Sequence, residues 1–340
     1  MVLVTMKLCL VLLLGLSGAL ATNHTRQKRC DQDSISEVSG TFAWSGYCVG
    51  DTIFYDNFDD FEEDRWTHEI WQPGNVNGEF QAYVNSRDNS YAQDSTLHIK
   101  VTTDSNPVRS ARMITSNSFA FKYGILEIRA KLPEGDWLWP AMWMMPKDSV
   151  YGGWPRSGEI DMIESRGNRQ LIQNNVNIGV EHVGSTLHWG PAWNVDAWSH
   201  ATWGKNRSPG YASDFHVYRV EWTKDHMKFT VDGEEIGSVY PSDSGFYGLG
   251  QLDGQENPWG GASNYKMAPF DQQFFIILNV AVGGTNYFFP DDASNPSAKP
   301  WSNTSPTASS DFWNARAQWL STWQGDDAHL QVDYVKVFAV

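Results

Sequence analysis

Three acidic residues in one short stretch are the strongest indication of chemistry in this sequence. The stretch SGEIDMIESRG, residues 157–167, contains Glu159, Asp161 and Glu164 among apolar residues. Glu159 and Asp161 are two apart, so they lie on one face of a β-strand, because successive side chains of a strand point to opposite faces. Glu164 is three residues further on and lies on the other face of a regular strand. A β-bulge, which inserts one extra residue, would place all three carboxyls on one face, and we expect such a bulge here.

Three carboxyls on one face can hydrolyse a glycosidic bond. With the bulge, the Cα atoms of Glu159 and Glu164 are on the order of 13 Å apart. Side chains that converge on a substrate can then bring the carboxyls to about 5–5.5 Å, the separation found in retaining glycosidases. One Glu attacks the anomeric carbon, while the other protonates the leaving oxygen and then activates water. Asp161 between them raises the pKa of a neighbouring carboxyl. The spacing alone fits a solvated acidic strand face equally well.

The elements that must position these carboxyls are β-strands. In residues 126–132, apolar residues alternate with Glu, Arg and Lys, which is typical of a half-buried strand. The run FFIILNVAV, residues 274–282, is typical of a strand buried on both faces. Short runs of this kind recur, separated by Gly, Asn, Asp and Pro, and helical periodicity is almost absent. The sequence therefore predicts a single all-β domain, a sandwich or barrel, over residues 30–340. It also predicts loops at 193–214 and 285–310 and one short helix within 312–324.

Charge and aromatic content limit the classes of partner. The chain carries a net charge of −15, and residues 1–29 contain four basic residues and no acid, so the remainder is more acidic still. Its overall field does not attract nucleic acid or anionic membranes. The 17 Trp and 13 Tyr favour a surface that stacks on the flat apolar faces of sugar rings. For any single Trp, filling a large β core is an equally good explanation.

The N-terminus predicts secretion. Residues 1–21 combine one Lys, an apolar run and the small-residue cleavage site ALA at 19–21, which is typical of a signal peptide. The apolar run is short for a membrane anchor. The basic sequence RQKR at 26–29 predicts that residues 22–29 form a short pro-piece. We therefore expect a secreted, extracellular chain that begins at or near Cys30.

An oxidising compartment sets expectations for cysteine and asparagine. Cys9 lies in the predicted signal peptide, which leaves Cys30 and Cys48 as an even pair and predicts one disulfide. The sequons that begin at Asn206 and Asn303 are candidates for N-glycosylation, although each is followed by Pro, which weakens the sequon.

The acidic stretch resembles the E-x-D-x-x-E signature of glycoside hydrolase family 16, in the bulged form of its laminarinases. The resemblance continues, in order, over most of residues 50–340. Together the similar segments resemble invertebrate secreted endo-1,3-β-glucanases and their relatives, the β-1,3-glucan recognition proteins. These segments are NGEFQAYV (77–84), ARMIT (111–115), YGILEIRAKLPEGDWLWPAMWMMP (123–146), STLHWGP (185–191), NVAVGG (279–284) and QVDYVKVF (331–338).

The resemblance implies a jelly-roll β-sandwich of the concanavalin-like lectin and glucanase type, with a concave substrate cleft. It implies that Glu159 is the nucleophile, Glu164 the general acid/base and Asp161 the assisting carboxyl. It also implies a set of substrate-binding residues, namely Trp139, Trp143, Trp154, His188, Asn77 and Arg112. For His188, a core histidine beside Trp189 is the other interpretation.

Metal chemistry is not needed for this reaction. The sequence contains no H-E-x-x-H motif and no C-x-x-C pair, so we expect no catalytic zinc and no required cofactor. A serine-hydrolase mechanism is disfavoured because no G-x-S-x-G is present. The family resemblance allows a structural calcium, with Asp333 as a candidate ligand. A solvated acidic side chain on a strand is the other interpretation of Asp333.

Two classes of function remain in competition. The leading hypothesis is an endo-acting β-1,3-glucanase, a monomer that hydrolyses laminarin-like glucans with retention and has no nucleic-acid or membrane partner. The alternative is a non-catalytic β-1,3-glucan-binding recognition protein of innate immunity. Such proteins often replace the catalytic glutamates and usually carry an extra N-terminal module. Both glutamates are present here, and residues 30–51 are too short for such a module, which favours the enzyme. A transglycosylating enzyme is a third possibility.

Overall fold

The computed structural model describes residues 30–61 and 63–340. The predicted signal peptide and pro-piece, residues 1–21 and 22–29, lie outside the described residues. In the part of the chain that is described, no helix is long and apolar enough to cross a membrane.

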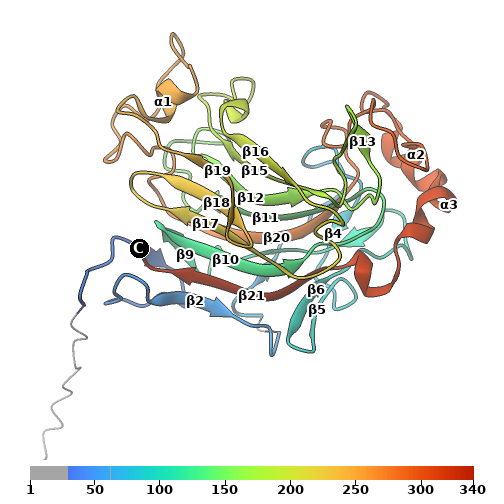
Figure 1. Ribbon diagram of the computed structural model, residues 1–340, viewed down its shortest axis with the longest axis horizontal. Helices are drawn as coiled ribbons and strands as arrows, with labels where there is room; N and C mark the ends of the chain where they lie inside the picture. The colour runs from blue at the N-terminus through green and yellow to red at the C-terminus, as the bar shows by residue number, and fades with distance from the viewer. Residues whose placement is uncertain (1–29, 62) are drawn as a thin grey trace, which may run out of the picture.

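Two stacked, mainly antiparallel sheets form the domain, which confirms the predicted all-β sandwich (Figure 1). The nine-stranded sheet, called here the concave sheet, contains in order β1 (Glu37–Ser39), β9 (Ala120–Lys122), β20 (Phe274–Val282), β11 (Leu138–Pro146), β12 (Glu159–Ser165), β15 (His182–His188) and β16 (Thr202–Asn206). In addition, β8 (Arg112–Ile114) pairs with β20, and β3 (Thr67–His68) pairs with β8. The eight-stranded sheet, called here the convex sheet, contains in order β19 (Glu234–Val239), β18 (Met227–Val231), β17 (His216–Trp222), β10 (Gly124–Lys131), β21 (Leu330–Phe338), β6 (Thr96–Ile99) and β5 (Ser90–Gln93), with β2 (Thr52–Asp56) beside β21.

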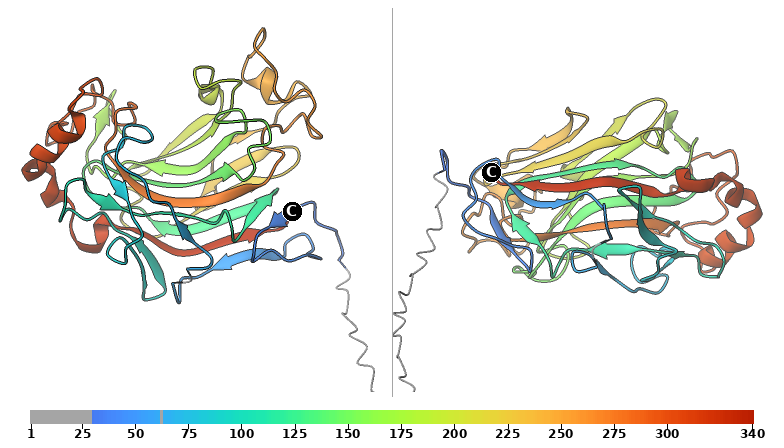
Figure 2. Two further views of the ribbon diagram at one scale, coloured as in Figure 1. Left: turned by 180° about the vertical axis from the view of Figure 1, so that it is seen from behind. Right: turned by 90° about the horizontal axis from the view of Figure 1, so that it is seen from below.

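The remaining elements are short and lie in the connections. Figure 2 shows the C-terminal helical segment at one end of the sandwich and the C-terminus at the other. Two small sheets pair β13 (Ile172–Gln173) with β14 (Val176–Asn177), and β4 (Ala82–Tyr83) with β7 (Arg109–Ser110). The helices are α1 (Gly245–Leu249), α2 (Ala308–Asn314), α3 (Arg316–Trp319) and the 3-10 turns η1 (Trp198–His200), η2 (Leu320–Thr322) and η3 (Gly325–Ala328).

Hydrophobic alternation determines which face of each strand enters the core. Along β10, Leu126, Ile128 and Ala130 are fully buried, while the charged residues between them are partly exposed. This is the pattern that the sequence predicted for one face against the core and one towards solvent. In β20 every residue but one is buried, because this strand lies inside the concave sheet and is covered on both faces.

Two predictions about connections were wrong in detail. The predicted loop at 193–214 contains η1 and the strand β16, which pairs along its length with β15. Because β16 is an edge strand whose residues are all at least partly exposed, it lacks the apolar alternation that identifies a strand. The helix predicted within 312–324 begins earlier, at α2, where Asp311 in the first turn accepts hydrogen bonds from the hydroxyls of Ser305 and Thr307, both at 3.0 Å. It is followed by α3 and η2.

The two sequons differ in their surroundings. Asn206 lies on the exposed face of β16 and bonds to His182 and to the carbonyl of Asn177. Asn303 is buried, and its amide nitrogen donates to the carbonyl of Phe289 at 2.9 Å. A glycan on Asn303 would require this side chain to leave its buried position, so the structure does not favour that predicted site.

A disulfide joins Cys30 and Cys48, as predicted. It closes a loop that lies against the C-terminal end of the chain. The amide of Ile35 donates to the carbonyl of Val340, and the amide of Gly50 donates to the carbonyl of Ala339, both at 2.8 Å. These hydrogen bonds fasten the N-terminal segment to the residues that follow β21, and the bridge keeps the loop between them closed.

Replacing both cysteines by serine is expected to lower the free energy of unfolding by about 3 kcal/mol. Without the bridge, the unfolded chain regains the conformational entropy that closing a loop of this length removes. Urea denaturation of the oxidised wild type and the double variant measures the difference. Equal midpoints and slopes for the two proteins would contradict this role of the bridge.

Candidate active site

A β-bulge in β12 places Glu159, Asp161 and Glu164 on one face of the concave sheet. Against β15, they pair with His188, Thr186 and Gly184, which are two apart and therefore share a face. The register shifts by one residue between Asp161 and Glu164, and the pairing of β12 with β11 shows the same extra residue. The bulge expected from the sequence is thus confirmed.

The three carboxyls form an electrostatically strained cluster. Burial, followed by the charge of Asp161, raises the pKa of Glu159 to about 8. Burial and the charge of Glu164 raise the pKa of Asp161 to about 6. Burial also raises the pKa of Glu164, to which the charge of Glu159 adds. Because each carboxyl disfavours ionisation of its neighbours, the cluster retains a proton near neutral pH.

His188 provides a positive charge within hydrogen-bond distance of the cluster. Its Nε2 lies 3.2 Å from Asp161, and its Nδ1 lies 2.6 Å from Asp196. Burial alone would lower the pKa of His188, but hydrogen bonds to the two carboxylates outweigh it and raise the pKa to about 12. With an acceptor on each nitrogen the ring is an imidazolium. Its charge lowers the pKa of all three carboxyls and partly offsets their repulsion.

A stack of side chains positions Glu164. Trp139 donates its indole N–H to Glu164 at 2.9 Å. The indole lies flat on Phe288, with ring centroids 3.9 Å apart and an interplanar angle of 8°. The guanidinium of Arg166 lies 4.0 Å from the Phe288 ring on which Trp139 stacks, and donates to the Phe288 carbonyl at 2.6 Å. Trp139 is only 5% exposed, so it holds the carboxyl more than it offers a face to a ligand.

Glu159 has a separate and more open partner. Trp154 donates its indole N–H to Glu159 at 2.7 Å. The Trp154 side chain is 44% exposed and lies beside His188, with ring centroids 5.9 Å apart. This indole can therefore both orient Glu159 and present an apolar face to a sugar ring.

The cluster lies in a cleft of about 910 Å³ on the concave sheet. The cleft contains all nine residues proposed for the site from the sequence, which are Asn77, Arg112, Trp139, Trp143, Trp154, Glu159, Asp161, Glu164 and His188. Arg112 is already engaged: its guanidinium lies between the rings of Trp71 and Trp143, at 4.3 and 4.6 Å, and it pairs with Glu69. Asn77 donates to Glu79 at 3.3 Å.

Several residues of this cleft were not identified from the sequence. Glu79 is one: burial raises its pKa despite hydrogen bonds from Gln81, Asn77 and Tyr83. Asn279 is another, and it accepts the indole N–H of Trp143 at 2.7 Å. The sequence did contain an indication for Asn279, because it is a polar residue within the otherwise apolar run of β20. Sequence patterns gave no indication for the cleft residues Trp71, Trp198 and Phe288. Nor did they indicate Asp196, which lies behind the cleft lining and bonds to His188.

The surroundings of Asp333 do not fit a calcium site. This side chain lies on β21 in the convex sheet, where its carboxylate pairs with Arg129 at 2.5 Å. The guanidinium occupies the position that a cation would take. Asp333 also belongs to neither of the two groups of side chains that could hold a metal ion among residues 30–61 and 63–340.

Replacing Glu159 by Gln is expected to stabilise the fold at pH 8 by up to about 4 kcal/mol, with no effect near pH 4. Between the ordinary pKa of 4.5 and the folded value of about 8, the folded state holds a proton that the unfolded state has lost. The free energy of unfolding of the wild type therefore falls as the pH rises through this window. Glutamine keeps the acceptor for Trp154 and carries no charge.

Urea denaturation from pH 4 to 8 tests this prediction. Glu235→Gln, at an exposed position of β19, is the matched control and should follow the wild type. Equal pH dependence in Glu159→Gln and the wild type would show that the cluster is not strained.

Comparisons with known proteins agree with this geometry. The profile described as glycosyl hydrolases family 16 matches residues 77–249. The chain is 47% identical over 339 residues to the β-1,3-glucan-binding protein of Penaeus monodon, covering 84% of this chain and 89% of that protein. It is 35% identical over 284 residues to glucan endo-1,3-β-glucosidase A1 of Niallia circulans, covering 77% of this chain but only 38% of that protein.

The fold comparison gives the same family. The crystal structure of the laminarinase from Rhodothermus marinus is similar with a TM-score of 0.59 and 27% identity, over 86% of this chain and 98% of that one. The predicted jelly-roll architecture is therefore confirmed. The cleft, the bulged strand and these similarities show that this chain belongs to glycosyl hydrolases family 16.

Proposed function

We propose that this protein is a retaining endo-β-1,3-glucanase. The observation that carries the proposal is the bulge in β12, which keeps two glutamates and one aspartate on one face inside a cleft lined by aromatic side chains. A protein that only binds glucan has no need of three neighbouring carboxyls, one buried and two half-buried, with raised pKa values, because their repulsion costs stability. Such a loss of stability is expected at a site where the carboxyls take part in a reaction.

In the proposed reaction, ionised Glu159 attacks the anomeric carbon and forms a glycosyl ester. Glu164 donates its proton to the glycosidic oxygen, and the bond between that oxygen and the anomeric carbon breaks. The reducing-end part of the glucan then leaves. Glu164, now a carboxylate, takes a proton from water, whose oxygen displaces Glu159 from the sugar. Two inversions at one carbon give net retention.

The neighbouring side chains divide the supporting tasks. Asp161 and Glu159 share a hydrogen bond, so Asp161 can hold the proton that Glu159 must give up before it attacks. Trp139 and Trp154 direct their N–H groups at the two glutamates and fix their rotamers. The imidazolium of His188 stabilises negative charge on Asp161 while the shared proton lies on Glu159.

Laminarin-like β-1,3-glucan is the proposed substrate. The names of the relatives from Penaeus monodon and Niallia circulans both refer to this polysaccharide. Exposed Trp154 and Trp198 in the cleft suit the apolar faces of glucose rings. We also propose that the protein acts outside the cell, which the disulfide supports.

Glucan binding without catalysis is the second candidate, because the relative from Penaeus monodon, at 47% identity, is named as a binding protein. An immune recognition role is compatible with either candidate. Transglycosylation needs the same carboxyls and differs only in the acceptor, a sugar hydroxyl in place of water.

Release of new reducing ends from laminarin is expected for the wild type. Glu164→Gln should lower kcat by about 10²–10⁴-fold, which is the usual contribution of a general acid. Glu159→Gln should abolish turnover, since no ester can form. Both variants should still bind laminarin, and Glu235→Gln should retain full activity. Analysis of product chain length separates hydrolysis from transglycosylation.

Azide distinguishes the two glutamate roles. It should rescue Glu164→Ala with formation of a β-glucosyl azide, because azide then replaces water in the second step. With Glu159→Ala it should give the α-azide, because azide then replaces the nucleophile. Laminarin binding by a wild type that never cleaves it would refute the enzyme and support the binding protein.

Replacing His188 by Gln is expected to move the bell-shaped pH profile of kcat/KM upward by about one unit. The imidazolium lowers the pKa of Glu159 and Glu164, so both carboxyls ionise at higher pH without it. The acid limb, which requires ionised nucleophile, and the alkaline limb, which requires protonated acid, therefore both shift upward.

His182→Gln is the matched control, at the other end of β15 in the same cleft. Burial lowers the pKa of His182, so this ring is neutral near pH 7 and its replacement removes no charge. A profile that is unmoved in His188→Gln would show that His188 has no electrostatic role.

A further inference from the structure

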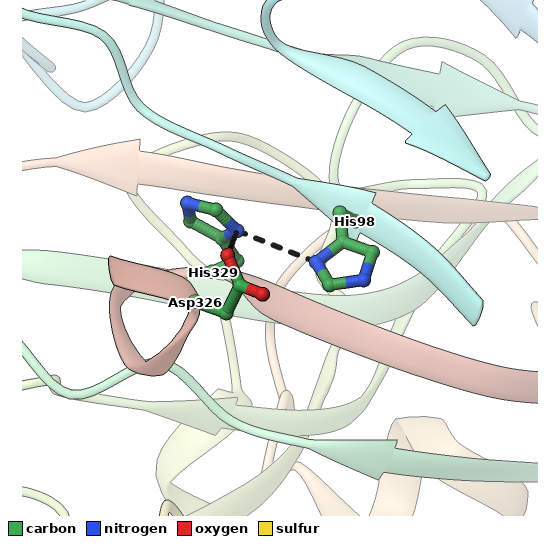
Figure 3. A group of neighbouring side chains, drawn as sticks. All are labelled: His98, Asp326 and His329. Atoms are coloured by element: carbon green, nitrogen blue, oxygen red, sulfur yellow. Dashed lines mark hydrogen bonds and ion pairs between the residues drawn. The ribbon is translucent and has the colours of Figure 1, made fainter. Parts of the chain in front are cut away.

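Two buried histidines and an aspartate meet on the convex sheet, away from the glucan cleft. His98 lies on β6, and His329 comes directly before β21, the neighbouring strand. Both rings are at most 5% exposed. Asp326 belongs to η3, the turn that leads into β21, and its side chain is 62% exposed. Figure 3 shows the two imidazole rings with one nitrogen of each directed at the other, and the carboxylate beside His329.

The distances between the polar atoms fit ligands around a single tetrahedral ion. The Nδ1 atoms of His98 and His329 are 3.3 Å apart, and Nδ1 of His329 is 3.5 Å from Oδ1 of Asp326. One atom from each of the three residues lies within 4.8 Å of the others. Ligands bound at about 2.0–2.1 Å in a tetrahedron are about 3.3 Å apart. The histidine pair already has the spacing of such an edge.

We propose that His98, Asp326 and His329 form a binding site for a divalent transition-metal ion such as zinc. Two imidazole nitrogens and one carboxylate oxygen are a ligand set that suits zinc, copper and nickel. Calcium and magnesium require mainly oxygen ligands and are disfavoured. A fourth ligand, water or another small molecule, completes the tetrahedron from the solvent side.

The surroundings hold the ligands in place and leave access for the ion. Tyr91 on β5 pairs with His98 on β6, and the two rings stack with centroids 5.0 Å apart and an interplanar angle of 3°. This stacking fixes the orientation of the His98 ring. A cavity of about 770 Å³ is lined by His329 and Asp326 and opens to solvent. The carboxylate of Asp94 makes the electrostatic potential at His98 more negative, which favours a cation. The ammonium of Lys100 has the opposite effect at His329.

A bound ion would join parts of the chain that are far apart in sequence. His98 belongs to the β5–β6 hairpin, whereas Asp326 and His329 follow the C-terminal helical segment. The ion would fasten η3 to the edge of the convex sheet. We therefore assign the site a structural role that is independent of glucan cleavage.

Titration of tag-free, metal-depleted protein with ZnCl₂ in a calorimeter tests the proposal. One equivalent of zinc should bind, and Tm should rise by about 3–5 °C at zinc concentrations about 100-fold above Kd. Asp326→Asn and His329→Gln should weaken binding at least about tenfold, because even the loss of groups that only support ligands costs that much. Calcium and magnesium chlorides should leave Tm unchanged.

Two variants are matched controls and should bind zinc like the wild type. Asp327→Asn alters the next residue of η3, whose carboxylate pairs with Lys131 instead. Glu159→Gln removes a ligand from the other cluster that could hold an ion, formed by Glu159, Asp161 and His188.

The possible results separate the proposal from its alternatives. If the two histidines only share a hydrogen bond, the wild type will bind no zinc, and the proposal fails. Zinc binding that is lost in Glu159→Gln but retained in Asp326→Asn would place the ion in the cleft and would also overturn it. If His329→Gln does not fold, the exposed Asp326→Asn variant decides by itself.

Discussion

One extra residue in β12 is the constraint on which the site depends. Neighbouring strands on both sides keep a regular alternation, so the shift between Asp161 and Glu164 must be absorbed within β12 itself. Met162 and Ile163 are both buried at this point, which shows where the second residue of the bulge goes. Without the bulge, Glu164 would enter the apolar core between the sheets, where an unpaired carboxylate is very costly. With the bulge, Glu164 instead shares the cleft face with Glu159 and Asp161.

Keeping three carboxyls together requires a supporting shell that comes from several elements. His188, held between Asp161 and Asp196, supplies one full positive charge within hydrogen-bond distance. Two indole N–H groups supply partial positive charge at the glutamates. These interactions lower the free energy of the ionised cluster without neutralising it. The remaining strain is consistent with groups that must change protonation state during a reaction.

The two sheets of the sandwich carry different chemistry. The concave sheet and its end loops form the cleft, which is lined by aromatic side chains and carboxyls. The outer face of the convex sheet bears the pair His98 and His329 beside Asp326. Because a fully packed core separates the two faces, each can be altered without direct contact with the other.

The sequence by itself determined the all-β class, the disulfide and the bulged carboxyl strand, because period-two alternation, an even pair of cysteines and local motif spacing can be read from the residues alone. The other six cleft residues proposed from the sequence came from the resemblance to a family and not from a local pattern. It did not reveal β16, whose exposed edge carries no apolar pattern. Nor did it indicate the roles of Asp196 and Phe288 or the cluster of His98, Asp326 and His329, because the partners of these residues lie on other elements of the fold. Only strand pairing brings His98 within reach of His329, 231 positions away along the chain. Such contacts depend on register and sheet order, which are decided by packing of the whole core rather than by any local stretch.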